Sequence, residues 1–170
     1  VFSYAMFRDL ERLQTPFTGI AAHRTFSANL AYKGQTMSGE GMLVSGSYFP
    51  LLGVQPALGR RLQPGDDKVP GESRNLLTLL GGRGNVLNQA MVVNGQTLTI
   101  VGVAARGFDG TTLGNRPHVY VPVTLRAQME PGFEGFENRR SYWAYLFARL
   151  KPGLTAEQAF VGNQAGDIKP

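Results

Sequence analysis

Cysteine is absent from the sequence of 170 residues. Its absence excludes disulfide bonds, CxxC redox chemistry, zinc sites built from thiolates and a cysteine nucleophile. It does not fix the cellular compartment, because exported proteins can also do without cysteine.

Long hydrophobic runs are absent too. No window of about 18 apolar residues occurs, so the sequence predicts no membrane-spanning helix. There is no signal peptide, and the chain begins at Val1 without an initiator methionine. We therefore expect it to be a piece of a longer protein.

Lysine is scarce, and charged residues make up only 17% of the chain. The net charge of +5 comes mostly from arginines that are scattered along the sequence. A nucleic-acid-binding protein more often clusters its cations on one helix or places them between exposed aromatic residues. The sequence therefore predicts no nucleic-acid binding, while a position near anionic lipid headgroups fits the same charge.

Residues for catalysis or metal binding are few. His23 and His118 have no second ligand at close spacing, so no metal site is predicted. Asp66 and Asp67 belong to a Pro-Gly turn, and we expect both side chains to point to solvent without a raised pKa. We predict no catalytic, cofactor-binding or metal-binding residues.

The residues that are present predict short elements. Ser3 can cap a helix with Phe7, Leu10 and Leu13 on one face. An extended segment from Phe17 to Tyr32 follows.

A second strand is expected from Met37 to Val44. Gly39 and Gly41 inside it indicate a β-bulge or the close approach of another backbone.

The clearest local signal is "MVVNGQTLTIVGV", residues 91–103. Asn94-Gly95 is the preferred pair for a two-residue type I′ turn, so the segment predicts a β-hairpin in which Val93 pairs with Gln96.

The C-terminal part predicts a strand, a turn and a helix. "SYWAYLFARL", Ser141 to Leu150, is strongly apolar and should form a buried strand. Thr155 and Gln158 then form a capping box at the start of a helix. This order resembles the opening half of a βαβ or ferredoxin-like unit and favours the α+β class.

The stretch "VSGSYFPLLGVQPALGR", Val44 to Arg60, alternates apolar anchors with turns. Ser47 to Leu52 fits one short helical turn, and Gly53 suits the left-handed position after it. No acid, histidine or cysteine occurs there, so the stretch indicates shape rather than chemistry. Outside it, Phe108, Phe133 and Phe136 lie in glycine-rich loops and are the candidate contact residues for a partner or ligand.

Four segments in this order carry a resemblance that covers nearly the whole chain: "FSYAMFRDLERLQTPFTGIAAHR", "GMLVSGSYFPLLGVQPALGRRLQPGDD", "VLNQAMVVNGQTLTIVGVAARGF" and "YLFARLKPGLTAEQA". Together they resemble the MacB-like periplasmic core domain of FtsX/MacB-type ABC transporter permeases. The resemblance implies an α+β fold, with a porter-like βαβ subdomain interrupted by a mixed α/β lobe. Residues 1–45 and 139–170 would form the porter-like subdomain, and residues 46–138 the inserted lobe with its hairpin at 91–103.

The resemblance also implies a function and partners. The domain would be extracytoplasmic and non-catalytic, and would couple motion of the permease's transmembrane domain to a substrate or partner outside the membrane. A separate ATPase subunit would drive it, and no cofactor is implied. Within it, the inter-lobe joint would be the short helix with its four anchors: Tyr48, Phe49, Leu51 and Leu52.

The chain departs from the family's pattern in two places. Residues 68–85 are too short to hold both the strand and the aromatic-rich helix usual there, so either these elements are lost or residues are missing. The chain also starts at the helix rather than at a preceding strand, which would leave strand edges open for a homodimer.

Two other functions stay open at this point. An exported ligand-binding or sensor module would use Phe108, Phe133 and Phe136 to line an apolar pocket between the lobes. A hydrolase with an unfamiliar site would draw on residues such as Asp109, His118 and Glu130.

Overall fold

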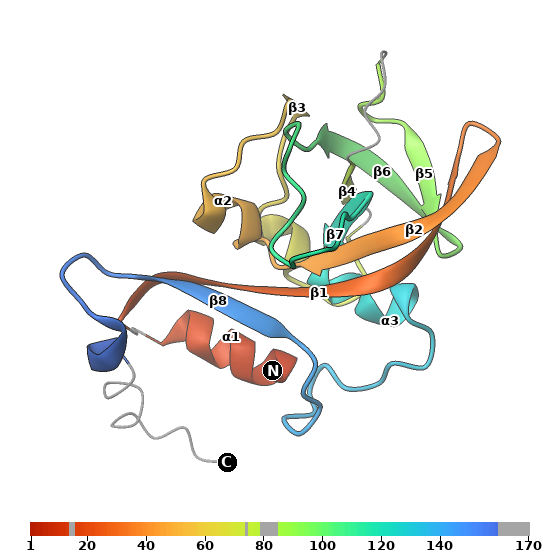
Figure 1. The fold of residues 1–170 in the computed structure, drawn as a ribbon. Coiled ribbons are helices and arrows are strands. Elements are labelled where there is room, and N and C mark those ends of the chain that lie inside the picture. The colour runs from red at the N-terminus through yellow and green to blue at the C-terminus, as the bar shows by residue number, and fades with distance from the viewer. Residues whose placement is uncertain (14–15, 74, 79–84, 160–170) are drawn as a thin grey trace.

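The computed structural model describes residues 1–13, 16–73, 75–78 and 85–159. It is an α+β fold, as expected, with a few short helices around one large sheet (Figure 1). The elements, in chain order, are α1 (Tyr4–Arg12), β1 (Phe17–Tyr32), β2 (Gln35–Val44), α2 (Tyr48–Leu52), β3 (Leu58–Gly59), the 3-10 turn η1 (Pro64–Asp67), β4 (Asn75–Thr78), β5 (Ala90–Val93), β6 (Gln96–Val103), β7 (Val119–Pro122), the 3-10 turn η2 (Val123–Leu125), α3 (Arg126–Met129) and β8 (Tyr145–Leu150). Within the described residues no helix is long and apolar enough to cross a membrane.

Strand β1 runs through the whole molecule. Its 16 residues change partner along their length. From Phe17 to His23 the strand pairs with β8, and from His23 to Tyr32 with β2. His23 is therefore the position at which one partner replaces the other, opposite Val44 on one side and Tyr145 on the other.

The second half of β1 belongs to a closed ring of strands. β1 pairs with β2, and the ring continues through β7, β4, β6 and β5 back to β1. The β2–β7 and β4–β6 pairs are parallel, and the other pairs of the ring are antiparallel. We call this ring the barrel. Because β2 and residues 23–32 of β1 are part of it, the barrel includes segments that lie before the expected inserted lobe.

The first half of β1 leaves the barrel with β8 and forms a two-stranded layer. We call it the β1–β8 layer. Alternate residues of a strand point to opposite faces, and both faces are covered here. Ala22 lies in the same cluster as Phe7 of α1, and Ala21 in the same cluster as Tyr48 of α2. Figure 1 shows α1 on one side of the layer and α2 on the other.

Helix α1 begins at the cap that its sequence predicts, and it ends earlier than its apolar pattern suggests. The Ser3 hydroxyl accepts a hydrogen bond from the N–H of Met6, which confirms the expected cap. Phe7 and Leu10 are buried on the inner face. Leu13, expected on the same face, lies just past the last helical residue and is 54% exposed.

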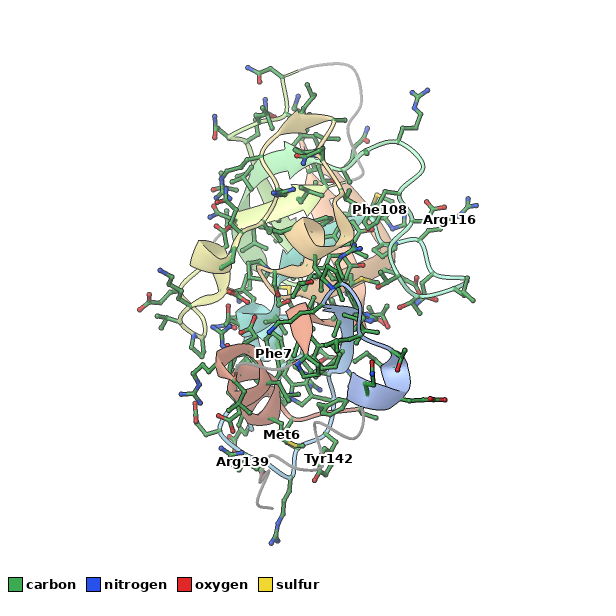
Figure 2. The ribbon with its side chains drawn as sticks, turned by 90° about the vertical axis from the view of Figure 1, so that its left-hand side faces the viewer. Met6, Phe7, Phe108, Arg116, Arg139 and Tyr142 are labelled. Carbon is green, nitrogen blue, oxygen red and sulfur yellow. The ribbon has the colours of Figure 1, made fainter. Side chains whose placement is uncertain are left out.

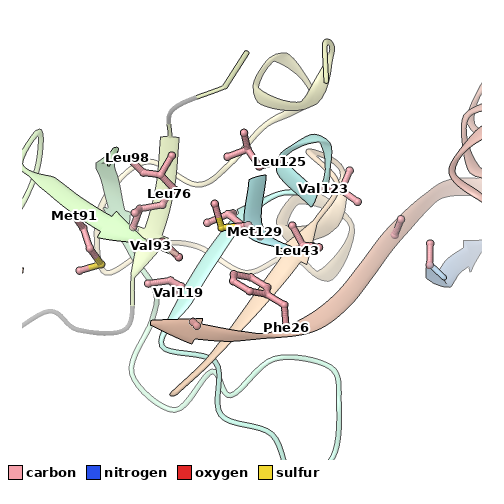
Figure 3. Close-up of a cluster of buried hydrophobic side chains, with 14 of the residues drawn as sticks. Phe26, Leu43, Leu76, Met91, Val93, Leu98, Val119, Val123, Leu125 and Met129 are labelled. Atoms are coloured by element: carbon pink, nitrogen blue, oxygen red, sulfur yellow. The ribbon is translucent and has the colours of Figure 1, made fainter. Parts of the chain in front are cut away.

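The core of the barrel is filled by aliphatic and aromatic side chains from all six strands of the ring (Figure 3). The ring of Phe26 lies directly over Gly41, where an added Cβ would meet ring carbons at 2.3–2.9 Å. Gly39 faces the ring of His118 in the same way, because an added Cβ would lie 2.5 Å from Nδ1 of that ring. The pairing of β1 with β2 continues without a shift past both glycines. The expected bulge was therefore wrong, and both glycines make room for side-chain rings rather than for another backbone.

The hairpin at residues 91–103 is confirmed. Val93 pairs with Gln96 across the two-residue turn, as predicted. Asn94 and Gly95 have φ values of +47° and +80°, as a type I′ turn requires. The β4 strand, Asn75–Thr78, lies in the short segment 68–85 and completes the ring between β6 and β7.

The expected burial of residues 141–150 was partly wrong. Trp143 and Ala144 are buried, but Tyr142 is 59% and Tyr145 52% exposed. Strand β8 pairs only with β1 among the described strands, so it is an edge strand with one face partly open. The capping box expected after β8 is confirmed. The Thr155 hydroxyl accepts a hydrogen bond from the N–H of Gln158, and the Gln158 side chain accepts one from the N–H of Thr155.

Candidate functional site

The candidate site is the junction at which β1 passes from the β1–β8 layer into the barrel. Helix α2 covers this junction. It ends at Gly53, which has φ +71° and donates its N–H to the carbonyls of Phe49 and Pro50. Tyr48 and Phe49 are fully buried, while Leu51 and Leu52 pack at the edge of the same cluster. All four predicted joint residues therefore lie at the junction.

Tyr48 is the centre of the apolar part of the junction. Its ring lies 5.5 Å from the ring of Phe147 on β8 and 6.3 Å from that of Tyr120 on β7. Its hydroxyl lies 2.9 Å from the Thr111 hydroxyl and 3.4 Å from the sulfur of Met42. Burial raises the pKa of the Tyr48 phenol, so it stays neutral. One side chain thus contacts the layer, the barrel and the loop that follows β6.

Two serines complete the edge of β1 where β2 has ended. The N–H of Ser45 donates to the carbonyl of Ala22 at 2.9 Å, and its hydroxyl accepts from the N–H of Ala22 at 3.0 Å. The hydroxyl of Ser47 donates to the carbonyl of Ile20 at 2.8 Å. A buried backbone group without a partner destabilises the folded state, so these hydroxyls take the place of a continuing strand and let β1 leave the barrel.

A buried carboxylate holds the connection from β2 to α2. Asp67 is 1% exposed and accepts a hydrogen bond from the N–H of Gly46. Arg8 of α1 donates to the backbone carbonyl of Asp67 at 2.9 Å. Burial raises the pKa of the Asp67 carboxyl. The prediction that this acid points to solvent was wrong, because η1 folds back onto residues 45–47.

The neighbouring Asp66 was also expected to point to solvent, and it does not. Its carboxylate accepts two hydrogen bonds from Arg60, at 2.8 and 2.9 Å. It also accepts from the N–H of Gln63 and from the amide of Asn75. Burial alone would raise the pKa of Asp66, but these donors lower it below its usual value. The turn is therefore fastened to the barrel at β4.

Helix α1 reaches the same network through its charged face. Arg8 forms an ion pair of 2.6 Å with Glu11, and Glu11 lies 3.4 Å from the hydroxyl of Ser47. Burial raises the pKa of Glu11. Burial also raises the pKa of Tyr4, the phenol beside Arg8, to about 12. The polar junction therefore joins α1, η1 and the start of α2.

The loop from α3 to β8 forms an aromatic strap over α1. Phe133 and Phe136 pack edge-to-face, and each also packs on Trp143. Phe136 lies 5.0 Å from Tyr4 of α1. We call residues 130–143 the strap.

A sandwiched arginine fastens the strap. The guanidinium carbon of Arg126 lies 3.9 Å from the centre of the Phe133 ring and 4.1 Å from that of Trp143. Its Nε donates to Glu130 at 2.8 Å. Burial lowers the pKa of Arg126 from its usual value, and the hydrogen bond to Glu130 opposes this shift. Arg24 of β1 donates to the carbonyl of Trp143 at 3.0 Å and so ties the strap to the junction strand.

The three predicted contact residues do not lie together. Phe133 and Phe136 belong to the strap, in the cluster that contains α1. Phe108 packs on Phe49 and Tyr120 in the other cluster. Figure 2 shows Phe108 beside the loop that carries Arg116, away from the end of the molecule where Phe7 and Arg139 lie.

A cavity of about 560 Å³ lies instead along the outer face of α1. Only Phe136 of the three phenylalanines lines it, and most of the other lining residues are charged: Arg8, Asp9, Glu11, Arg12, Lys68, Glu137 and Arg139. This is not the apolar pocket expected for a ligand-binding module.

The candidate hydrolytic residues have separate partners. Asp109 lies 3.7 Å from Arg116 in the exposed loop after β6, and Glu130 pairs with Arg126. His118 packs its ring against Gly39. In the part of the chain that the structure describes, no group of three His, Cys, Asp or Glu side chains could hold a metal ion.

Sequence reasoning missed the polar half of the junction. No sequence motif indicated the roles of Asp67, Ser45 and Arg126, because each of them contacts a residue that is distant in the sequence. The signal available was local: a Ser-Gly-Ser run directly after a strand, where hydroxyls can replace ladder hydrogen bonds.

Comparison with known proteins supports the fold and the family. The structure resembles the periplasmic region of MacB from Actinobacillus actinomycetemcomitans, with a TM-score of 0.69 at 12% identity, covering 95% of this chain and 70% of that one. It also resembles the extracellular domain of the noncanonic ABC-type transporter YknZ from Gram-positive bacteria, with a TM-score of 0.68 at 15% identity, covering 95% of this chain and 78% of that one.

A third similar structure is a domain of a putative permease protein from Porphyromonas gingivalis. Its TM-score is 0.63 at 14% identity, and the match covers 99% of this chain and 73% of that one. Among curated proteins, no sequence matches this chain.

The family model of the MacB-like periplasmic core domain matches residues 2–160. The chain therefore belongs to this family of extracytoplasmic domains of ABC transporter permeases.

Proposed function

We propose that the domain transmits motion between the membrane part of its permease and a substrate or partner outside the membrane, and that it does so by flexing at the junction. The observation that carries the proposal is the path of β1. One strand of 16 residues belongs to two units and changes partner at His23. A displacement of the β1–β8 layer is therefore passed along a continuous backbone into the barrel.

The chemistry of the junction suits a flexing element. On one face the contacts are rings around Tyr48, which can slide without losing much buried area. On the other face they are hydrogen bonds between side chains and backbone groups: Ser47 and Arg8 donate to carbonyls, and Ser45 accepts from an N–H. Such polar contacts have a defined geometry and can favour one arrangement of the two units.

The same proposal includes the partners and the absence of catalysis. A separate ATPase subunit would supply the driving force on the cytoplasmic side, and the extracytoplasmic domain would do no bond chemistry. The division into residues 1–45 with 139–170 and residues 46–138 stays a prediction. We propose that the flexing boundary within it lies at His23 and Ser45, because the barrel takes in β2 and the second half of β1.

The test is a distance measurement across the junction in the full-length permease with its ATPase. These 170 residues contain no cysteine, so a label introduced in this domain meets no competing thiol within it. Leu58 lies on β3, which pairs with β6 of the barrel, and Leu154 lies beyond β8. They are 48% and 37% exposed and are suitable positions. We expect the Leu58→Cys/Leu154→Cys distance distribution to change when ATP is added.

A matched pair within the barrel serves as the control. Met37 is 40% exposed and lies on β2, so the Met37→Cys/Leu58→Cys distance should not change with ATP. If neither pair responds to ATP, the domain moves as one rigid body and the proposed flexing is wrong. If both respond, the barrel itself deforms and the hinge does not lie at the junction.

A further inference from the structure

The side-chain carboxamide of Asn94 forms hydrogen bonds with backbone groups outside its own turn. Its Oδ1 accepts a hydrogen bond from the N–H of Asn29 at 2.7 Å. Its Nδ2 donates to the carbonyl of Ser27 at 3.0 Å and to the carbonyl of Met129 at 2.7 Å. Every hydrogen-bonding atom of the carboxamide therefore has a backbone partner.

These partners come from two elements, so the carboxamide joins its own turn to both of them. Asn94 belongs to the turn between β5 and β6, Asn29 and Ser27 to β1, and Met129 to the end of α3. The backbone N–H of Asn94 also donates to the carbonyl of Asn29 at 2.9 Å. Only two residue pairs, Leu30 with Val93 and Ala31 with Val92, form the ladder between β1 and β5. The carboxamide thus extends the pairing of β1 with β5, which we call the seam and which is the shortest pairing that β1 makes.

Asn94 and Gly95 form the only Asn-Gly step of the sequence. Asparagine followed by glycine is chemically labile, because the missing Cβ of glycine leaves its backbone nitrogen free to approach the asparagine side chain. The N–H of Gly95 loses its proton to solvent, and the nitrogen attacks Cγ of Asn94. The Cγ–Nδ2 bond then breaks, and Nδ2 takes up a proton from solvent and leaves as ammonia. Water then opens the resulting succinimide to aspartate or isoaspartate.

We propose that Asn94 is a deamidation site that the closed barrel protects, and that its conversion releases the seam between β1 and β5. Protection follows from the three hydrogen bonds, which hold Cγ in place toward β1 and keep the leaving nitrogen bound to two carbonyls. Attack by Gly95 requires the Asn94 side chain to rotate away from β1, and this rotation breaks all three hydrogen bonds. The reaction then proceeds only from molecules in which the seam has opened locally.

The product cannot restore the contact. A carboxylate has no N–H, so the carbonyls of Ser27 and Met129 lose their donor and face a negative charge instead. An isoaspartate also lengthens the backbone within a two-residue turn. Each conversion is irreversible, and the modified fraction therefore accumulates with the time that the seam has spent open.

The first test compares the rate of deamidation in the folded chain and in the same chain unfolded in urea. Both are incubated in the same mildly alkaline buffer, and the peptide that contains Asn94 is followed by mass spectrometry. We expect the folded chain to react at least about tenfold more slowly, because the open seam is a minor state. Equal rates in the two samples would show that the fold gives no protection and would overturn the proposal.

The second test uses the product directly. Asn94→Asp is compared with Asn115→Asp, because the side chain of Asn115 makes no hydrogen bond to the described residues. We expect Asn94→Asp alone to lower the equilibrium constant for folding, by about tenfold or more. If both variants are as stable as the original chain, the contact does not hold the seam and the proposal fails. If Asn94→Asp does not fold at all, the seam depends on the carboxamide, and the rate comparison still measures the protection.

Discussion

The carboxylate of Asp67 accepts a hydrogen bond of 2.9 Å from the backbone N–H of Gly46. The two residues are 21 positions apart in sequence, and the contact is buried. Gly46 has no room for a side chain, because a Cβ would lie 2.3 Å from the carbonyl oxygen of Gln63. The start of α2 is therefore pressed against η1, and a single carboxylate satisfies the donor that this close approach buries.

Replacing Asp67 with alanine should destabilise the domain strongly. The change leaves the N–H of Gly46 buried without a partner, which costs about 1–3 kcal/mol in the free energy of unfolding. Urea unfolding of Asp67→Ala measures the loss. The exposed Asp109 is the control, and Asp109→Ala should unfold at the same urea concentration as the original chain. Equal midpoints for the two variants would mean that the contact does not support the junction.

Gly41→Ala should destabilise the barrel because the new methyl group would overlap the ring of Phe26. Overpacking of this kind lowers the free energy of unfolding by about 1–3 kcal/mol. Gly65→Ala is the matched control, since a Cβ at Gly65 meets nothing within 4 Å. Adding Phe26→Leu to Gly41→Ala should recover part of the loss, and no recovery would place the strain elsewhere.

The hydroxyl of Tyr48 should contribute through its contact with Thr111. Tyr48→Phe and Thr111→Val each remove one side of a hydrogen bond of 2.9 Å. We expect each variant to lower the free energy of unfolding by about 0.5–1.5 kcal/mol. The double variant should lose little more than either single one, because the two changes remove the same bond. Fully additive losses would show that the two hydroxyls do not interact.

Arg126 should control the environment of the only tryptophan, Trp143. Arg126→Ala removes the cation from between the two rings and leaves a space beside the indole. We expect the emission of Trp143 to shift and the free energy of unfolding to fall by about 2 kcal/mol or more. Arg140→Ala is the control, because Arg140 is exposed and its side chain is not part of the strap's ring contacts. Unchanged emission in Arg126→Ala would contradict the sandwich.

The parts of this fold that the sequence predicted are those encoded locally. The Ser3 cap, the Asn94-Gly95 turn and the Gly53 helix end each depend on residues within a few positions of one another, and all are confirmed. The four expected joint residues come from a short apolar stretch broken by turns, and their role as an inter-lobe joint stays a prediction. The family resemblance supplied the order of elements that local patterns could not.

The parts that were missed depend on contacts between distant segments. Asp67 belongs to a Pro-Gly turn that looks solvent-exposed by composition, and only the fold places Gly46 against it. Arg126 is 8% exposed because Phe133 and Trp143 lie on either side of it. Phe108, Phe133 and Phe136 share a glycine-rich setting, but the chain carries them to two different clusters.

Protonation of His23 should weaken the domain in mildly acidic solution. Its ring lies among Tyr48, Tyr145 and Phe147, each about 6 Å away by ring centres, and no charged group contacts it among the described residues. Burial lowers the pKa of His23 from its usual 6.5. In the unfolded chain the imidazole takes up a proton near pH 6.5, whereas in the folded chain it stays neutral to lower pH. The stability that this group contributes is therefore present above pH 6.5 and is lost as the pH falls below it.

The effect is isolated by comparison with His23→Phe, which keeps an aromatic ring at the junction and cannot be protonated. Between about pH 7.5 and about pH 5.5 the urea midpoint of the original chain should fall more than that of the variant. Buried carboxyls act in the opposite direction: the raised pKa values of Glu11 and Asp67 make the folded state bind protons more readily as the pH falls. Because both proteins carry these groups, their difference reports His23 alone. Parallel curves would mean that His23 is as easily protonated in the folded state as in the unfolded one, and that the partner change of β1 has no sensitivity to pH at this position.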